Sequence, residues 1–167
     1  MSIKISNSIS LDGFICGPNG EESWISEADE KFFLAECEAA DVIILGANTY
    51  SGNGGLFPVV PKDHYVFTSQ PEKFEPAEHM NYTTQTPEAF VAEHAGKDIL
   101  IAGGGHLNAS FLKAGLVTDI TACVHPIILG AGTRQFEGID FTNMTELSRV
   151  SQQDIGDNVT LIHYQIK

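Results

Sequence analysis

Three consecutive glycines, Gly103, Gly104 and Gly105, end a short apolar run over residues 99–102 and open a helical pattern that includes Leu107. A turn without side chains allows a ligand to approach the backbone closely. The first turn of the following helix offers unpaired N–H groups and the positive end of the helix dipole, which suit a phosphate. The segment therefore predicts phosphate binding, although a glycine run is equally compatible with a strand-to-helix turn that binds nothing.

Two other segments place small or hydroxyl-bearing side chains where a predicted strand ends, after the apolar runs at 42–45 and 65–67. In parallel sheets, ligands bind beyond the carboxyl ends of the strands. Convergence of these segments with the glycine turn would therefore make a groove for a phosphate-rich cofactor. The residues concerned are Gly46, Ala47, Asn48, Thr49, Thr68, Ser69 and Gln70.

The elements that must position these turns follow from the pattern of apolar residues. Apolar strands that alternate with helices predict a parallel α/β sheet covered on both faces, in one domain of 167 residues. The alternating C-terminal strand predicts an antiparallel edge or hairpin, and Ser26 is the expected N-cap of the first helix, with Asp29 in its first turn. The predicted strands cover 3–9, 42–45, 65–68, 99–102, 120–128 and 159–166, the later helices cover 86–95 and 106–114, and 10–23 and 51–62 are loops.

Composition excludes several functional classes. The chain has 22 acidic and 9 basic residues and a formal charge of −13, which repels nucleic acid and anionic membranes, so neither is an expected partner. No apolar stretch approaches the roughly 20 residues of a membrane helix, and the N-terminus lacks the apolar region of a signal peptide. The odd, scattered cysteines (Cys16, Cys37 and Cys123) fit a reducing compartment, so a cytoplasmic location is expected. The six histidines lack metal-ligand spacing, so no metal site is expected.

Taken in order, these segments resemble the dihydrofolate reductase-like superfamily over nearly the whole chain. Residues 9–15 are similar to its loop over the nicotinamide, and the glycine turn is similar to its turn at the pyrophosphate. Residues 126–132 match a Pro-x-x-Leu-Gly-x-Gly pattern typical of the reductase domain of riboflavin biosynthesis. The resemblance implies a mixed, mostly parallel sheet with helices on both faces, a cis peptide between Gly103 and Gly104, and NADPH as cofactor, with NADH as the alternative.

The resemblance also implies roles for individual residues. Asp29 is the implied catalytic carboxylate, which orients the substrate or helps to protonate it, and Glu30 is the competing assignment. The implied substrate contacts are Asn7, Trp24, Phe33 and Arg134, although Arg134 also fits an exposed loop position. The implied cofactor contacts are Leu11, Asp12, Gly13, Gly46, Ala47, Asn48, Thr49, Thr68, Ser69, Gln70, Gly103, Gly104, Gly105, His106 and Leu107.

Two segments depart from the family pattern. The family often places Arg or Lys after the glycine at position 46 to pair with cofactor phosphate, whereas this chain has Ala47 and Asn48. The loop 51–60 lacks the acidic, Asp-Pro-containing segment of the riboflavin branch, which argues against a phosphoribosylaminouracil substrate.

The expected function is NAD(P)H-dependent reduction of a small pterin-, folate- or pyrimidine-like heterocycle. The alternative is a non-catalytic nucleotide-binding protein of the same fold. Many members of the riboflavin branch are dimers, so the resemblance also allows a homodimer.

Overall fold

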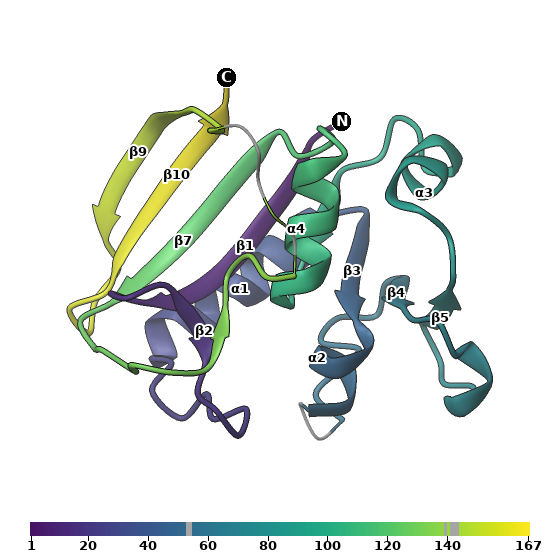
Figure 1. Ribbon diagram of the computed structural model, residues 1–167, viewed down its shortest axis with the longest axis horizontal. Coiled ribbons are helices and arrows are strands. Elements are labelled where there is room, and N and C mark those ends of the chain that lie inside the picture. The colour runs from purple at the N-terminus through teal and green to yellow at the C-terminus, as the bar shows by residue number, and fades with distance from the viewer. Residues whose placement is uncertain (53–54, 139, 141–143) are drawn as a thin grey trace.

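The computed structural model describes residues 1–52, 55–138, 140 and 144–167. Its main sheet contains eight strands in the order β5-β4-β3-β6-β1-β7-β10-β9 (Figure 1). The strands are β1 (Ile3–Ser10), β2 (Phe14–Cys16), β3 (Val42–Gly46), β4 (His64–Phe67), β5 (Met80–Thr83), β6 (Ile99–Ile101), β7 (Asp119–His125), β8 (Thr133–Arg134), β9 (Leu147–Asp154) and β10 (Thr160–Ile166). The helices are α1 (Glu27–Ala39), α2 (Ala47–Gly52), α3 (Pro87–Glu93), α4 (Gly105–Lys113) and the short 3₁₀ helix η1 (Pro71–Lys73).

Strand direction divides the sheet into two parts. The six strands from β5 to β7 pair in parallel, whereas β10 pairs antiparallel with both β7 and β9. The predicted mixed, mostly parallel α/β sheet is therefore confirmed. Because parallel strands end at the same edge, the turns after β3, β4 and β6 lie along one side of the sheet.

Helices cover both faces of the parallel part, and in Figure 1 α4 lies in front of the sheet and α1 behind it. The successive residues of β3 point to opposite faces, so Ile44 packs with Phe90 of α3 and Phe111 of α4. Ile43 packs with Cys37 of α1 on the other side. The strand is buried throughout, which explains why its sequence is a continuous apolar run.

The N-terminal end of α1 is built as expected. The side chain of Ser26 accepts a hydrogen bond from the backbone N–H of Asp29, and Glu27 and Glu30 also lie in the first turn. This cap satisfies one of the unpaired N–H groups of the helix and fixes where α1 begins. The cap therefore also fixes the position of Asp29 at the edge of the sheet.

Several elements differ from the predicted ones. β7 ends at His125 rather than at residue 128, because Pro126 has no N–H with which to continue the ladder, and Ile128 is 73% exposed. β9 was not predicted, since all its residues are exposed and it lacks an alternating pattern. β10 pairs antiparallel with β9, so the predicted C-terminal hairpin is confirmed, whereas the alternative of an edge strand is wrong because β9 forms the edge. β5 and the small β2–β8 ribbon were too short to produce a periodic signal.

Candidate functional site

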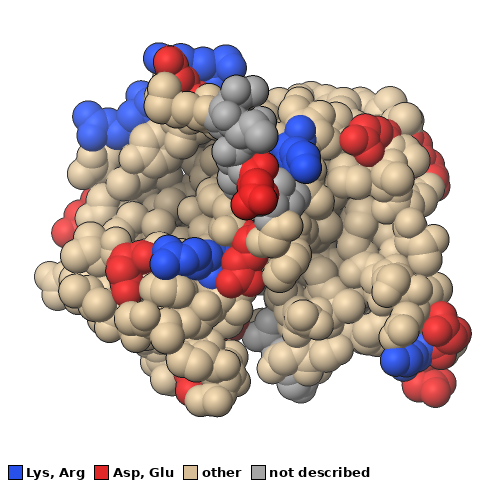
Figure 2. All heavy atoms as spheres, in the orientation of Figure 1, with Lys and Arg blue, Asp and Glu red and all other residues tan. Residues whose placement is uncertain are grey.

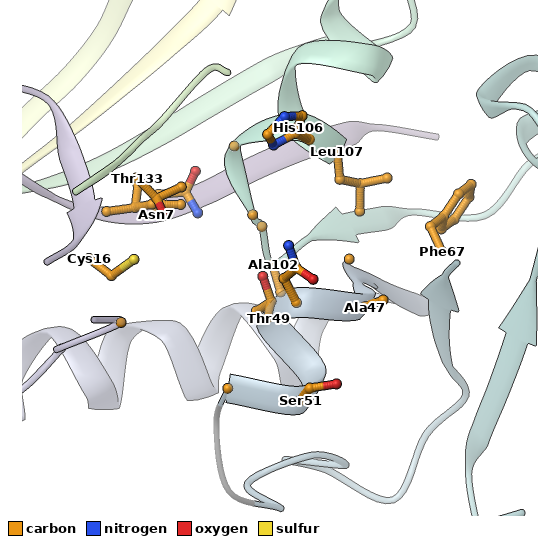
Figure 3. A pocket seen from close by; sticks show the side chains of 18 of the residues that line it. Asn7, Cys16, Ala47, Thr49, Ser51, Phe67, Ala102, His106, Leu107 and Thr133 are labelled. Carbon is orange, nitrogen blue, oxygen red and sulfur yellow. The ribbon is translucent and has the colours of Figure 1, made fainter. Parts of the chain in front are cut away.

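A groove of about 1210 Å³ runs along the carboxyl edge of the parallel strands. The three predicted turns meet in it, because residues 46–49, 68–70 and 103–107 all line its wall. Figure 3 shows Asn7, Cys16 and Thr133 on the left of the view and Ala47 and Phe67 on the right, with Thr49 near the centre below His106 of α4. The groove thus joins residues from β1, β2, α2, β4 and α4.

The glycine turn lies at the centre of this groove. The peptide between Gly103 and Gly104 is cis, as predicted, and the carbonyl of Gly103 accepts a hydrogen bond of 2.8 Å from the N–H of Gly46. Gly104 is the N-cap residue of α4, and no side chain caps that helix end. The first N–H groups of α4 therefore face the groove without a side-chain partner, as an anion site requires.

The three glycines of this turn are required for different reasons. Gly103 has a φ of +99°, which side chains disfavour. A Cβ on Gly104 would lie 3.0 Å from the hydroxyl oxygen of Thr49. A Cβ on Gly105 would collide with the carbonyl oxygen of Arg134. The missing Cβ of Gly105 therefore makes room for this chain's own backbone and not for a ligand.

A buried amide holds Asn7 against the glycine turn. The side-chain nitrogen of Asn108, in α4, donates to Oδ1 of Asn7 at 2.7 Å and to the carbonyl of Gln135 at 2.9 Å. Asn108 is fully buried, so its amide is fixed by these bonds. Because Oδ1 of Asn7 is the acceptor, its Nδ2 is free to face Gly103 and the groove. Sequence reasoning missed Asn108, which lies inside an otherwise ordinary helical pattern.

The wall beyond β4 carries a cation that sequence reasoning also missed. Thr68, Ser69 and Gln70 line the groove, and Lys73 of η1 lines it beside them. Among the described residues that line the groove, Lys73 is the only Lys or Arg. Ala47 and Asn48 lie where the family pattern often has a basic residue, so Lys73 supplies a positive charge from a different segment.

Asp29 occupies the opposite end of the groove. Its side chain is only 2% exposed and borders the cavity. Its Oδ2 has no hydrogen-bond partner, and Nε2 of His125 lies 3.5 Å from it. Burial raises the pKa of Asp29, although hydrogen bonds from Ser8 and Cys123 and the charge of His125 oppose this. A buried carboxyl that keeps its proton near a cavity can act as an acid.

His125 and Trp24 support Asp29 from outside the groove. His125 is buried and contacts the carbonyl of Cys123 through Nδ1 at 3.1 Å, while Nε2 accepts from the N–H of Ser26 at 3.3 Å. The ring of Trp24 packs edge-on against His125 with centroids 5.0 Å apart. Phe33 lines the cavity, whereas Trp24 is absent from its wall and packs beneath it.

The loop after β1 also lies outside the described groove wall. Leu11 is 68% exposed, and neither it nor Asp12 nor Gly13 lines the cavity. The carboxylate of Asp12 instead accepts hydrogen bonds from the hydroxyl of Ser10 (2.7 Å) and from the N–H groups of Leu129 and Gly130 (3.1 and 2.8 Å). These bonds, led by the one from Ser10, lower the pKa of Asp12 and tie the loop to the Pro-x-x-Leu-Gly-x-Gly segment.

Of the two remaining candidate residues, Glu30 lines the groove and Arg134 does not. Thr133 of β8 lines the groove, and since neighbouring strand residues point to opposite faces, Arg134 points away. Its guanidinium lies 4.7 Å from the ring centroid of Phe14. Glu30 lines the cavity together with Asp29, but its side chain is exposed whereas that of Asp29 is buried.

Among the described residues, no cluster of His, Cys, Asp and Glu could hold a metal ion, and no helix there is long and apolar enough to cross a membrane.

Known proteins resemble this chain in sequence and in fold. A protein of Bacillus subtilis named uncharacterized protein YwjB is 32% identical over 165 residues, covering 93% of this chain and 92% of its own length. The crystal structure of a deaminase/5-amino-6-(5-phosphoribosylamino)uracil reductase of Thermotoga maritima superposes with a TM-score of 0.78 at 17% identity, covering 99% of this chain and 56% of that chain. A dihydrofolate reductase of Enterococcus faecalis, solved with NADP(H), gives 0.74 at 18% identity, covering 99% and 96%.

The two structural likenesses confirm the dihydrofolate reductase-like fold. The description "RibD C-terminal domain" belongs to the family that matches residues 59–161, which span the strands from β4 to β10 and the glycine turn. That match covers more than half of the chain and includes the Pro-x-x-Leu-Gly-x-Gly segment. The chain therefore belongs to the RibD C-terminal domain family.

Proposed function

We propose that the protein is an NADPH-dependent reductase of a small planar nitrogen heterocycle of the pterin or pyrimidine type. One observation carries the proposal: a single groove joins an uncapped helix end at a glycine turn to a buried carboxyl that lacks a hydrogen-bond partner on Oδ2. The first feature suits a cofactor phosphate, and the second suits proton donation to a substrate. Reductases among the structural neighbours support the same reaction class.

The donor set and the size of the groove fit a dinucleotide. Its volume of about 1210 Å³ exceeds the roughly 300–1,000 Å³ of a typical small-molecule site, so it has room for a cofactor and a second ligand. The N–H groups of Gly105 and His106 would hold the pyrophosphate. Thr68, Ser69 and Lys73 would hold the adenosine phosphate, and the amide of Asn7 would lie near the nicotinamide end.

When bound, NADPH would supply a hydride, that is two electrons and one proton, for the carbon of a C=N bond. The nitrogen of that bond must then gain a proton, so that C=N becomes CH–NH. Asp29 is buried and borders the groove, and burial raises the pKa of its carboxyl. In this proposal Asp29 orients the heterocycle and assists protonation of its nitrogen, while the apolar side chain of Phe33 excludes water from one side.

Titration with NADPH tests the proposal directly. The chain has a single tryptophan, Trp24, so quenching of its emission and isothermal titration calorimetry both report binding. We expect saturable binding of NADPH, weaker binding of NADH, and NADPH oxidation in the presence of pterins or pyrimidines that carry a reducible C=N bond. Absence of NADPH and NADH binding would contradict the proposal.

A non-catalytic nucleotide-binding role is the second candidate, because Ala47 and Asn48 provide no charge at the expected phosphate position. The distinguishing measurement is transfer of deuteride from deuterated NADPH to a bound heterocycle under single-turnover conditions. Transfer would support the reductase, and tight cofactor binding without transfer to any pterin or pyrimidine probe would favour the second role.

A further inference from the structure

We infer that the substrate is an uncharged or cationic heterocycle without a phosphate or carboxylate tail. This inference rests on the proposed function and adds the substrate class. It comes from the distribution of charge along the groove. The end that contains Asp29 is lined by acidic, apolar and uncharged polar residues, and every described Lys and Arg except Lys73 is absent from the groove wall.

The basic residues are engaged elsewhere or lie outside the groove. Lys4 contacts Glu36 at 3.0 Å, Lys62 donates to the carbonyls of Glu38 and Ala40, and Arg134 stacks on Phe14. On the face drawn in Figure 2, Lys and Arg groups are few, and Asp or Glu groups stand beside several of them. The residues that the structure does not describe (53, 54, 139 and 141–143) include no Lys or Arg in the sequence.

Lys73 and Asp29 are associated with different strands of the sheet. Lys73 follows β4, whereas Asp29 hydrogen-bonds with Ser8 of β1, and β3 and β6 separate those two strands. Neighbouring strands are about 4.8 Å apart, so β4 and β1 are roughly 14 Å apart across the sheet. The positive charge of the groove is thus confined to the end assigned to the cofactor.

The helix end nearest to Asp29 does not replace the missing cation. The hydroxyl of Ser26 caps α1, and Glu27, Asp29 and Glu30 occupy its first turn. These carboxylates offset the positive end of the helix dipole. Glu22 and Glu30 line the same end of the groove, so a phosphate placed there would face carboxylates without a compensating cation.

The remaining wall suits a flat, uncharged ring. Ile15, Ile25 and Phe33 line the groove, and apolar walls of this kind hold planar ligands. Oδ2 of Asp29 is buried and has no hydrogen-bond partner, so it can pair with a ring N–H or an amino group. Glu22 and Glu30 would accept further N–H donors at the rim, which favours an amino-substituted heterocycle.

A matched pair of probes tests the inference: 6-hydroxymethylpterin and its phosphate monoester, which differ only in the charged group. Calorimetric titrations at low ionic strength, with and without saturating NADPH, measure the dissociation constant of each probe. We expect the alcohol to bind at least about tenfold more tightly than the phosphate ester, because like charges at close range oppose binding.

Charge-reversal variants test whether the preference for the alcohol over the phosphate ester arises from the charges of the groove. Glu30→Lys should reduce the ratio between the two probes or reverse it. The matched control is Glu78→Lys, whose side chain is 91% exposed in wild type and lies outside the groove wall; it makes the same change in net charge and should leave the ratio unchanged. A circular dichroism spectrum and a melting temperature for each variant confirm folding.

Equal or tighter binding of the phosphate ester by the wild type would overturn the inference, as would binding of neither probe. An unchanged ratio in Glu30→Lys would also overturn it. These results are separable from failure of the proposed function, because that failure is the absence of nicotinamide cofactor binding, which is measured independently of the probes.

Discussion

The two ends of the groove are lined by different kinds of chemical group. The end assigned to the cofactor consists mostly of backbone and small polar side chains, with Gly104 and Thr68 as examples and Lys73 as its one basic residue. The end assigned to the substrate consists of apolar side chains and carboxyls, with Phe33 and Asp29 as examples. Backbone N–H groups bind a phosphate whatever side chains surround them. A substrate, in contrast, is selected by the particular side chains that face it.

This difference suggests different tests for the two ends. In the proposed function, the glycine turn and Lys73 would hold the cofactor phosphates without a basic residue at position 47. At the proposed substrate end, the buried Oδ2 of Asp29 has no hydrogen-bond partner, so a ligand that supplies a donor there would satisfy it. The following predictions test the comparison, in order of decreasing expected effect.

The largest expected effect is on catalysis at the substrate end. Asp29→Asn should lower kcat about 100-fold or more, because a positioned acid typically contributes about 10²–10⁴-fold, while NADPH affinity stays unchanged. Steady-state loss of NADPH absorbance with the best heterocyclic substrate measures this. Glu30→Gln is the matched control, and a larger loss in Glu30→Gln than in Asp29→Asn would transfer the role to Glu30.

A smaller effect is expected on stability at the cofactor end. Gly105→Ala should destabilise the fold by about 1–3 kcal/mol, because its Cβ would meet the backbone carbonyl of Arg134, which cannot turn aside as a flexible side chain could. Gly46→Ala is the comparison, since its Cβ would meet its nearest neighbour, the nitrogen of Gly104, at an ordinary 3.6 Å. Urea unfolding measures both. Equal stability of the two variants would show that the Gly105 contact relaxes freely.

Next, charge at the cofactor end should discriminate between the two nicotinamide cofactors. Lys73→Gln should weaken NADPH binding about fivefold and leave NADH binding unchanged, since an exposed charge pair contributes up to about 1 kcal/mol. The difference should shrink at high salt. Lys97→Gln removes a lysine that lies outside the groove wall. Equal losses in the two variants would point to net charge rather than to a specific contact.

The smallest expected effect is a pH-dependent change in stability caused by Asp29. Burial raises the pKa of Asp29 above its ordinary value of 3.8, so the folded state binds this proton more tightly than the unfolded state. Stability from this group is therefore present below the ordinary pKa and is lost as the pH rises through the raised pKa.

The Asp29→Asn variant should not show this loss of folding stability at higher pH. Its melting temperature should exceed that of the wild type by on the order of a few degrees at neutral pH, and the difference should narrow as the pH falls toward 4. Differential scanning calorimetry over a pH series checks this. A variant that is less stable than the wild type at every pH would mean that hydrogen bonds to the carboxylate outweigh its desolvation.

Much of the fold was predictable because its signals are local. The buried run of β3, the N-cap at Ser26 and the proline at the start of α3 each act through neighbouring residues. β9 was missed because both of its faces are exposed, so its pairing with β10 depends on backbone bonds that leave no apolar pattern. The end of β7 was placed three residues too late, because the apolar residues continue past Pro126 although the hydrogen-bonded ladder does not.

The sequence by itself determined where chain direction changes, which segments are apolar and that three polar turns end parallel strands, because these properties depend on residues close together in the chain. Only the tertiary structure decided what each turn contacts. It brought Lys73 to the groove, moved Arg134 away from it, placed Asn108 under Asn7 and left one oxygen of Asp29 buried without a partner. These outcomes depend on strand order and on packing between distant segments, which no local pattern encodes.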